Sequence, residues 1–211
     1  MSLVRVHNFA ISLDGYGTGE GQSHDAHFGH AGDRLHRWMF ATRWWDPGGS
    51  SGVDDAFVRQ HDSGIGAEIM GAGKWGHPGW HEDPDWKGAW GPNPPFHTPV
   101  FILTHHSRPL IKMEGGTTFH FIDAAPAEAA ETARNAADGK DVRLGGGATV
   151  IREFLAARLV DHMHVVMVPI LLGRGVRLWD GLESLESDYQ IKADSSPSGV
   201  THLTFTVRRA Q

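Results

Sequence analysis

The segment from Asp141 to Leu155 constrains the fold more than any other part of the sequence. Val142 and Leu144 alternate with charged residues, which predicts a short, half-buried strand. Three consecutive glycines follow, and they leave the backbone without side chains where the chain must turn. Apolar residues then recur at the spacing of an amphipathic helix, at Val150, Ile151, Phe154, Leu155 and Leu159. The segment therefore predicts a strand, a bare turn and a helix.

Such a turn suits a phosphate group. Without Cβ atoms a ligand can approach the main chain closely, and the N–H groups and dipole of the following helix favour an anion. The alternative is a tight turn whose glycines only allow strand and helix to pack, but three glycines in a row favour the anion site. The pattern lacks the third glycine of the common dinucleotide fingerprint, because Val150 stands there, and no Gly-Lys-Ser/Thr follows. We therefore expect a nucleotide phosphate in an uncommon nucleotide-binding fold.

Composition excludes several classes of function. The chain has no cysteine, so it has no disulfide, no catalytic thiol and no cysteine-ligated metal site. Its net charge of −6 argues against nucleic acid or an anionic membrane as a partner. No apolar run reaches transmembrane length, and the first residues lack a basic region followed by an apolar core. We expect a cytoplasmic location.

Strand and helix patterns alternate along the chain. Strands are predicted at 4–12, 66–70, 99–103, 117–122, 142–144, 161–169, 189–193 and 200–208. Helices are predicted at 33–41 with Asp33 as the N-cap, at 53–62, at 125–138 and after the triple glycine. This order predicts an α/β fold in one domain, residues 1–211. Its mixed, mostly parallel central sheet has helices on both faces and ends in an antiparallel hairpin.

Polar residues follow several of the predicted strands. Asp14 comes directly after the first strand, where α/β proteins often place chemistry, although an Asx-turn is the more common role for Asp-Gly. Gly71, Gly73 and Lys74 form a second glycine turn, whose lysine could meet a phosphate or belong to an ordinary surface turn.

The segment 76–98 is a long loop rich in Trp, Pro and Gly, without periodicity. Four aromatic residues predict that it is ordered, namely Trp80, Trp86, Trp90 and Phe96. It could be a lid that stacks on a planar substrate, a packed loop or a subunit contact. The last of these favours a homodimer.

The many histidines suggest a metal site only weakly. His24, His27 and His30 recur every three residues, but Gly29 and Gly32 weaken any helix that would align them. His162 and His164 share one face of a strand without a clear third ligand. We therefore expect no metal.

Four segments in order resemble the dihydrofolate reductase-like superfamily, and in particular the reductase domain of the bifunctional riboflavin-biosynthesis deaminase–reductase. Ile11–Tyr16 resembles its Ser-x-Asp-Gly signature, and Ile69–Trp75 resembles its strand–glycine–helix turn. Val142–Leu155 resembles its Gly-Gly stretch, and Asp161–Gly175 resembles its penultimate shared segment. The resemblance implies a dihydrofolate reductase-like fold, NADPH as cofactor and a reductase similar to 5-amino-6-(5-phosphoribosylamino)uracil reductase.

The resemblance also implies roles for individual residues. The residues that would line the pyrophosphate of the cofactor are Gly145, Gly146, Gly147, Ala148 and Thr149. Those on its adenosine side are Gly71, Gly73 and Lys74, with Thr104 and His105 flanking the ribose 2′-phosphate and Arg108 as a further cation. Ala10 and the backbone of Tyr16 and Gly17 would face the nicotinamide, and Asp14 would orient the substrate or relay a proton.

Two functions remain open at this point. The first is NADPH-dependent hydride transfer to a small, planar heterocyclic substrate, in which the protein supplies positioning and electrostatics. The second is a non-catalytic protein of the same fold that binds NADPH or another ligand. Asp14 is the one acidic residue that stands out as a proton relay, and this keeps the second function open.

Overall fold

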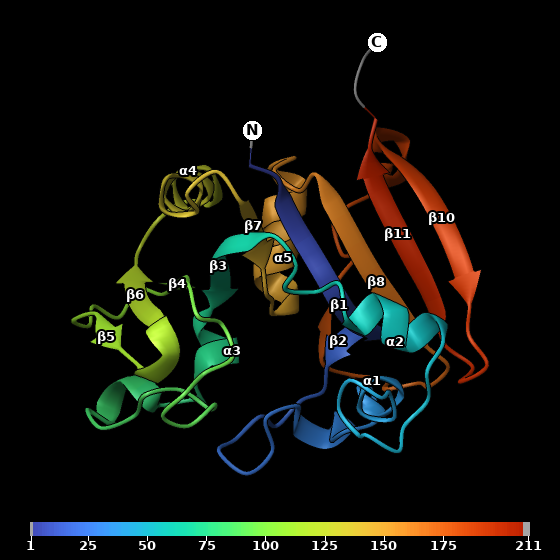
Figure 1. Ribbon diagram of the computed structural model, residues 1–211, viewed down its shortest axis with the longest axis horizontal. Helices are drawn as coiled ribbons and strands as arrows, with labels where there is room; N and C mark the ends of the chain where they lie inside the picture. The colour runs from blue at the N-terminus through green and yellow to red at the C-terminus, as the bar shows by residue number, and fades with distance from the viewer. Residues whose placement is uncertain (1, 209–211) are drawn as a thin grey trace.

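The computed structural model describes residues 2–208, and its main feature is one nine-stranded sheet (Figure 1). The strand order is β10-β11-β8-β1-β7-β3-β4-β6-β5. The bounds are β1 Val4–Ser12, β3 Ile65–Gly71, β4 Pro99–Leu103, β5 Ile111–Lys112, β6 Thr118–Ile122, β7 Asp141–Leu144, β8 His162–Val168, β10 Tyr189–Ser195 and β11 Thr201–Val207. A separate two-stranded ribbon pairs β2 (Tyr16–Thr18) with β9 (Val176–Arg177).

Most strand pairs in the central sheet are parallel. Six neighbouring strands, from β8 through β1, β7, β3 and β4 to β6, all run in the same direction. The closing hairpin of β10 and β11 and the short edge strand β5 are antiparallel. The predicted fold class, a mixed and mostly parallel sheet with a closing hairpin, is confirmed.

Helices cover both faces of this sheet. Their bounds are α1 Arg37–Phe40, α2 Val53–Val58, α3 Ala72–Trp75, α4 Pro126–Ala136 and α5 Ala148–Ala156, with short 3-10 turns at Gly29–Ala31, Trp80–Glu82, Glu114–Gly116 and Leu185–Asp188. On the first face, α4 and α5 bury Ala133 and Phe154 against strand residues such as Ile69 and Val165. In the described residues, no helix is long and apolar enough to cross a membrane.

Two separate groups cover the second face. At the β8 and β11 end, α1 and α2 pack Trp38 and Val58 on Val166. At the β3, β4 and β6 end, α3 and the Trp-rich loop form an aromatic cluster, and Figure 1 shows these two groups on opposite sides of the molecule. Trp75 in this cluster is 0% exposed, and its ring lies edge-on to those of Trp80 and Phe121. The loop 76–98 is thus packed against the sheet of its own chain.

Several predicted helix ends are wrong. Residues 33–41 form a helix only at Arg37–Phe40, and Asp33 is not its N-cap because its carboxylate binds the Arg37 guanidinium at 2.9 and 3.1 Å. The helix predicted at 53–62 ends at Val58, whose carbonyl lies 2.7 Å from His61 Nδ1. The strands β2, β5 and β9 were not predicted, since two or three residues are too few for a recognisable alternation.

The packing of the aromatic loop makes a testable prediction for stability. Replacing the buried Trp75 by alanine should lower the free energy of unfolding by about 3–5 kcal/mol, because a large cavity is left in a closed cluster. The control is Trp45→Ala, since Trp45 is 53% exposed and should change stability by less than about 0.5 kcal/mol. Urea unfolding followed by circular dichroism measures both. Equal effects of the two substitutions would contradict this packing.

Candidate functional site

The parallel strands end together, and this brings the predicted site residues to one edge of the sheet. The carboxyl ends of β1, β7, β3 and β4 are adjacent in that order. The segments that leave them are the Asp14 turn, Gly145–Thr149, Gly71–Lys74 and Thr104–His105, respectively. In open α/β sheets this carboxyl edge is where ligands bind.

The triple-glycine turn lies at the centre of this edge, between the ends of β1 and β3. The Gly145 N–H donates to the Ile69 carbonyl at 2.8 Å, and the Gly71 N–H donates to the Gly146 carbonyl at 2.8 Å. Gly146 has a φ of 113°, a conformation that L side chains rarely adopt, and a Cβ at Gly145 would lie 2.2 Å from Glu68 Oε1. These two glycines are therefore required by the fold itself.

The third glycine has a different environment. Gly147 is the N-cap of α5, and a Cβ added there would meet no atom within 4 Å. The first turn of α5 has no acidic residue and no side-chain cap. The ribbon strand β2 packs beside it, because a Cβ at Gly17 would lie 2.7 Å from Phe9 Cζ and 3.3 Å from Ala148 Cβ. An open helix N-terminus thus borders the turn, and Thr149 is exposed next to it.

A buried ionic group connects the two glycine turns. Glu68 is 1% exposed. One of its carboxylate oxygens accepts two hydrogen bonds from the Arg143 guanidinium, one from Nε at 2.8 Å and one from Nη2. Lys74 Nζ lies 3.4 Å from the other oxygen and donates to the Gly145 carbonyl at 2.8 Å. Burial lowers the pKa of Lys74, while Glu68 opposes that shift. The Lys74 ammonium therefore points into the protein and ties the β3 turn to the β7 turn.

Asp14 is bound entirely within its own chain. Its carboxylate accepts hydrogen bonds from Ser12 Oγ at 2.5 Å, from the Gly173 N–H at 2.7 Å and from the Leu172 N–H at 3.1 Å. The Ser12 bond first, and the two backbone bonds with it, lower the pKa of Asp14 to about 2. Asp14 is therefore ionised near neutral pH, and it holds the turn after β1 against the segment after β8.

The three residues predicted after β4, Thr104, His105 and Arg108, have different partners. Thr104 Oγ1 accepts the N–H of His106 at 3.0 Å, and the exposed His105 pairs with Asp123 at 2.9 Å. Arg108 donates to the carbonyl groups of Asp83 and Trp86, and its guanidinium lies 5.7 Å from the ring centres of Trp75 and Trp80. Arg108 therefore holds the aromatic loop in place, a role that the sequence did not predict.

Ala10 and Tyr16 lie on the second face and at its border. Ala10 is buried beside α1 and α2, two residues before the end of β1. The Tyr16 hydroxyl donates to the Gly173 carbonyl at 3.3 Å, and the Arg177 guanidinium lies 4.9 Å from the centre of its ring. Tyr16 therefore contacts the same segment after β8 that Asp14 holds.

The histidines form no metal site within residues 2–208, where no group of three or more candidate ligands is close enough to hold a metal ion. Two of them belong instead to a buried hydrogen-bonded chain, in which His164 contacts His202 and His202 contacts Asp54. Sequence reasoning missed this chain because its members are up to 148 residues apart.

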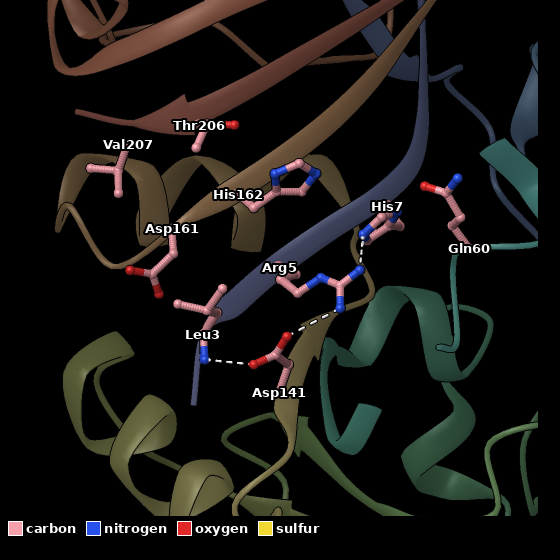
Figure 2. A pocket seen from close by; sticks show the side chains of 9 residues that line it. All are labelled: Leu3, Arg5, His7, Gln60, Asp141, Asp161, His162, Thr206 and Val207. Atoms are coloured by element: carbon pink, nitrogen blue, oxygen red, sulfur yellow. Dashed lines mark hydrogen bonds and ion pairs between the residues drawn. The ribbon is translucent and has the colours of Figure 1, made fainter. Parts of the chain in front are cut away.

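A cavity of about 560 Å³ lies elsewhere, at the amino ends of β1, β7 and β8 (Figure 2). Its lining residues are Leu3, Arg5, His7, Gln60, Asp141, Asp161, His162, Thr206 and Val207. Arg5 spans it, with Nη1 3.1 Å from Asp141 Oδ2 and Nη2 2.8 Å from His7 Nε2. Because parallel sheets bind ligands at their carboxyl ends, we place the candidate site at the glycine turns and not here.

The bonding of Asp14 predicts how stability depends on pH. The pKa of Asp14 is about 2 in the folded chain, against an ordinary value of 3.8. Its contribution to the free energy of unfolding is therefore complete above pH 3.8 and is lost as the pH falls towards 2. The difference in free energy of unfolding between the wild type and Asp14→Asn should therefore be constant from pH 7 to about 4.5 and shrink below that range. Urea titrations at each pH measure it. A difference that persists unchanged at pH 2.5 would rule out this role of the carboxylate.

Comparisons with known proteins bear on the fold and the family of the chain. A search of curated protein sequences found no significant match. A solved structure from Shewanella sp. PV-4, named as a riboflavin biosynthesis protein, is 22% identical, with a TM-score of 0.60 over 99% of this chain and 100% of that one. A pyrimidine reductase-like protein from Corynebacterium diphtheriae is 17% identical, with a TM-score of 0.55 over 99% of this chain and 93% of that one.

A third solved structure is the Thermotoga maritima diaminohydroxyphosphoribosylaminopyrimidine deaminase/5-amino-6-(5-phosphoribosylamino)uracil reductase. It is 14% identical, with a TM-score of 0.55, and the match covers 98% of this chain but 57% of that longer one. At these identities the structures show a shared fold. The family itself is shown by the sequence model of the RibD C-terminal domain, which matches residues 5–201. The chain therefore belongs to the RibD C-terminal domain family.

Proposed function

We propose that this protein is an NADPH-dependent reductase that transfers a hydride to a small, planar heterocyclic substrate. The observation that carries the proposal is the open N-terminus of α5, which follows a bare glycine turn between the carboxyl ends of β1 and β3. Membership of a family whose solved relatives include reductases supports the oxidoreductase class.

The residues at this edge fit a dinucleotide phosphate. A helix N-terminus carries about half a positive charge, and its first N–H groups lack partners within the helix. The open space at Gly147 and at Gly73, where a Cβ would meet no atom within 4 Å, leaves room for a ligand against the main chain. In the proposal, Gly145–Thr149 bind the pyrophosphate, and Gly71 and Gly73 line the adenosine side.

The rest of the edge completes the proposed cofactor site. Thr104 and the exposed His105 flank the 2′-phosphate, and Ala10 with the backbone of Tyr16 and Gly17 borders the nicotinamide. Lys74 acts indirectly, because its ammonium fixes the Gly145 carbonyl and so shapes the turn. Bound NADPH supplies the hydride, and the protein holds the reacting groups in position.

Asp14 is a positioning residue in this proposal. With a pKa of about 2 it carries almost no proton near neutral pH, which argues against a role as proton donor. Its three hydrogen bonds hold the segment after β8 against the turn that leads into Tyr16. It thereby fixes one wall beside the proposed nicotinamide position.

The names of two relatives and the remaining aromatic surface support the proposed substrate class. The Thermotoga and Corynebacterium proteins are named for pyrimidine substrates, which are small planar rings. Trp75 and Trp80 are buried in their own cluster, so the aromatic rings of the loop that are left to stack on a substrate are the partly exposed Trp86, Trp90 and Phe96. The homodimer prediction loses its main support for the same reason, and light scattering on the purified protein would decide it.

One observation favours the alternative, a binding protein without turnover. Asp14 was the one acidic candidate for proton transfer, and its carboxylate is occupied by the chain itself. This alternative predicts tight NADPH binding without oxidation in the presence of any acceptor. A panel of pyrimidine and pteridine acceptors, with NADPH absorbance as the readout, separates the two functions.

The first prediction of the proposal concerns the cofactor itself. Titration with NADPH should quench the tryptophan fluorescence in a saturable way, and NADH should bind at least tenfold more weakly because it lacks the 2′-phosphate. A tenfold ratio corresponds to about 1.4 kcal/mol of binding free energy. Absence of saturable binding by either nucleotide would remove the reductase proposal.

The second prediction tests the turn with a matched pair of variants. Gly147 and Gly52 are both helix N-caps, and at both positions an added Cβ meets no atom within 4 Å. Gly147→Ala should weaken NADPH binding by at least tenfold, because the methyl group fills the space against the pyrophosphate. Gly52→Ala adds the same methyl group at the N-cap of α2 and should leave the affinity within twofold of the wild type. Equal affinities of the two variants would show that Gly147 does not line the cofactor.

A further inference from the structure

Strand β1 contains a bulge that exchanges the faces to which its side chains point. Its register with β8 runs from Val6 opposite Met163 directly to Phe9 opposite Val165, so His7 and Asn8 share one partner position. Asn8 has a φ of 54°, as the extra residue of a bulge can. Val6 before the bulge and Ile11 after it both point into the α4 and α5 core, although they are an odd number of residues apart.

The bulge decides which residues meet the proposed cofactor site. Because it shifts the alternation by one, Ala10 points to the second face and Phe9 to the first. The Phe9 ring then lies beneath the glycine turns, since a Cβ at Gly146 would be 3.5 Å from Phe9 Cε2 and one at Gly17 would be 2.7 Å from Phe9 Cζ. An unbulged β1 would exchange the directions of these two side chains.

A buried chain of side chains holds the bulge from one end. The Asn8 N–H donates to His164 Nδ1 at 3.2 Å, so this imidazole nitrogen must accept and its proton must be on Nε2. His164 Nε2 then donates to His202 Nδ1 at 3.0 Å, and His202 Nε2 donates to Asp54 Oδ1 at 2.7 Å. The position of the proton on each imidazole therefore follows from one backbone donor, the N–H of Asn8 at the bulge.

The surroundings keep this chain in one arrangement. His164 is 1%, His202 0% and Asp54 5% exposed, and the Phe57 ring stacks on both imidazoles with centroids 4.2 and 4.4 Å away. Burial, together with the neighbouring His202, lowers the pKa of His164 to about 2, so it stays neutral and keeps Nδ1 as an acceptor. Asp54 belongs to α2, and the chain therefore connects α2, β11 and β8 to the bulge.

We propose that Asp54, His202 and His164 are positioning residues that lock the β1 bulge, and that this lock keeps the Phe9 ring beneath the glycine turn of the proposed cofactor site. The cofactor part of this inference rests on the proposed NADPH site. Up to 148 positions of the sequence separate these three residues. They act on the site by fixing to which face of the sheet each side chain of β1 points after the bulge. They contact no substrate or cofactor in this proposal.

Nitrogen-15 NMR of the imidazoles tests the lock without any cofactor. His164 should show the Nε2–H tautomer from pH 7.5 down to pH 5. At pH 7.5 His202 should carry a proton on Nε2, facing Asp54, and the amide of Asn8 should exchange with solvent slowly. In Asp54→Ala, His202 can carry its proton on Nδ1, which breaks its bond to His164, and exchange at Asn8 should accelerate at least tenfold. A His164 tautomer with the proton on Nδ1 would overturn the proposal.

NADPH affinity tests the link to the site. His164→Leu removes the acceptor at the bulge and should weaken NADPH binding at least tenfold. His164→Asn places Oδ1 near the former Nδ1, so it should restore the affinity to within about threefold of the wild type. Tyr189→Phe is the control, because it removes another buried hydrogen bond, from the Tyr189 hydroxyl to the Val160 carbonyl at 2.7 Å, and should leave affinity unchanged.

The outcomes separate this inference from the proposed function. If wild-type protein binds no NADPH while the tautomers and the Asn8 amide behave as described, the proposed function fails, the role towards the cofactor fails with it, and the bulge lock stands. If wild-type protein binds NADPH and a folded His164→Leu binds it equally well, the role towards the cofactor is overturned and the proposed function stands. Should His164→Leu not fold, Asp54→Ala with the same titration decides the matter.

Discussion

The carboxylate of Glu68 is a charge buried in the sheet, and the arrangement of the carboxyl edge depends on how it is satisfied. It binds Arg143 on the neighbouring strand and Lys74 beyond its own strand, and Lys74 then reaches the Gly145 carbonyl. A buried charge without such partners would be strongly destabilising, by about 3–5 kcal/mol when one partner is removed. The same group excludes any side chain at Gly145, since a Cβ there would overlap Glu68 Oε1. The glycine turn and the ion group therefore depend on each other.

The second face of the sheet shows how the chain surrounds this edge without long helices. At one end the aromatic loop, held by Arg108, covers β3, β4 and β6. At the other end the short helices α1 and α2 rely on the buried Asp54–His202–His164 chain and on the rings that pack around it. At both ends, hydrogen bonds of buried polar side chains among aromatic rings hold the covering segment on the sheet, where other folds use a long helix. The site edge lies between them, where α5 begins on the opposite face.

Much of the fold could be predicted because its signals are local. Val4–Ser12 and Pro99–Leu103 were predicted with their observed bounds, since buried parallel strands are nearly continuous apolar runs. The sequence placed Asp14, Gly71, Lys74 and Gly145 at the ends of separate predicted strands, and the parallel order of those strands brings them to one edge. Helix ends were less predictable, because they depend on single side-chain contacts. Asp33 binds the Arg37 side chain, and the His61 ring contacts the Val58 carbonyl. The role of Arg108 was missed because its partners lie 22 and 25 residues earlier in the chain.

The sequence by itself determined the class of the sheet, the family and the position of the glycine turn, because alternation, turn residues and helical spacing act between near neighbours. Only the tertiary structure decided that the Lys74 ammonium is bound to the Gly145 carbonyl, that Asp14 is held as a carboxylate, and that β1 is bulged at Asn8. The bulge shows the reason most clearly. A strand with one extra residue reads as an ordinary apolar run, and the acceptor that fixes its phase comes from His164, 156 residues away. Contacts between distant segments carry no local signature, so they emerge only when the sheet has brought its strands together.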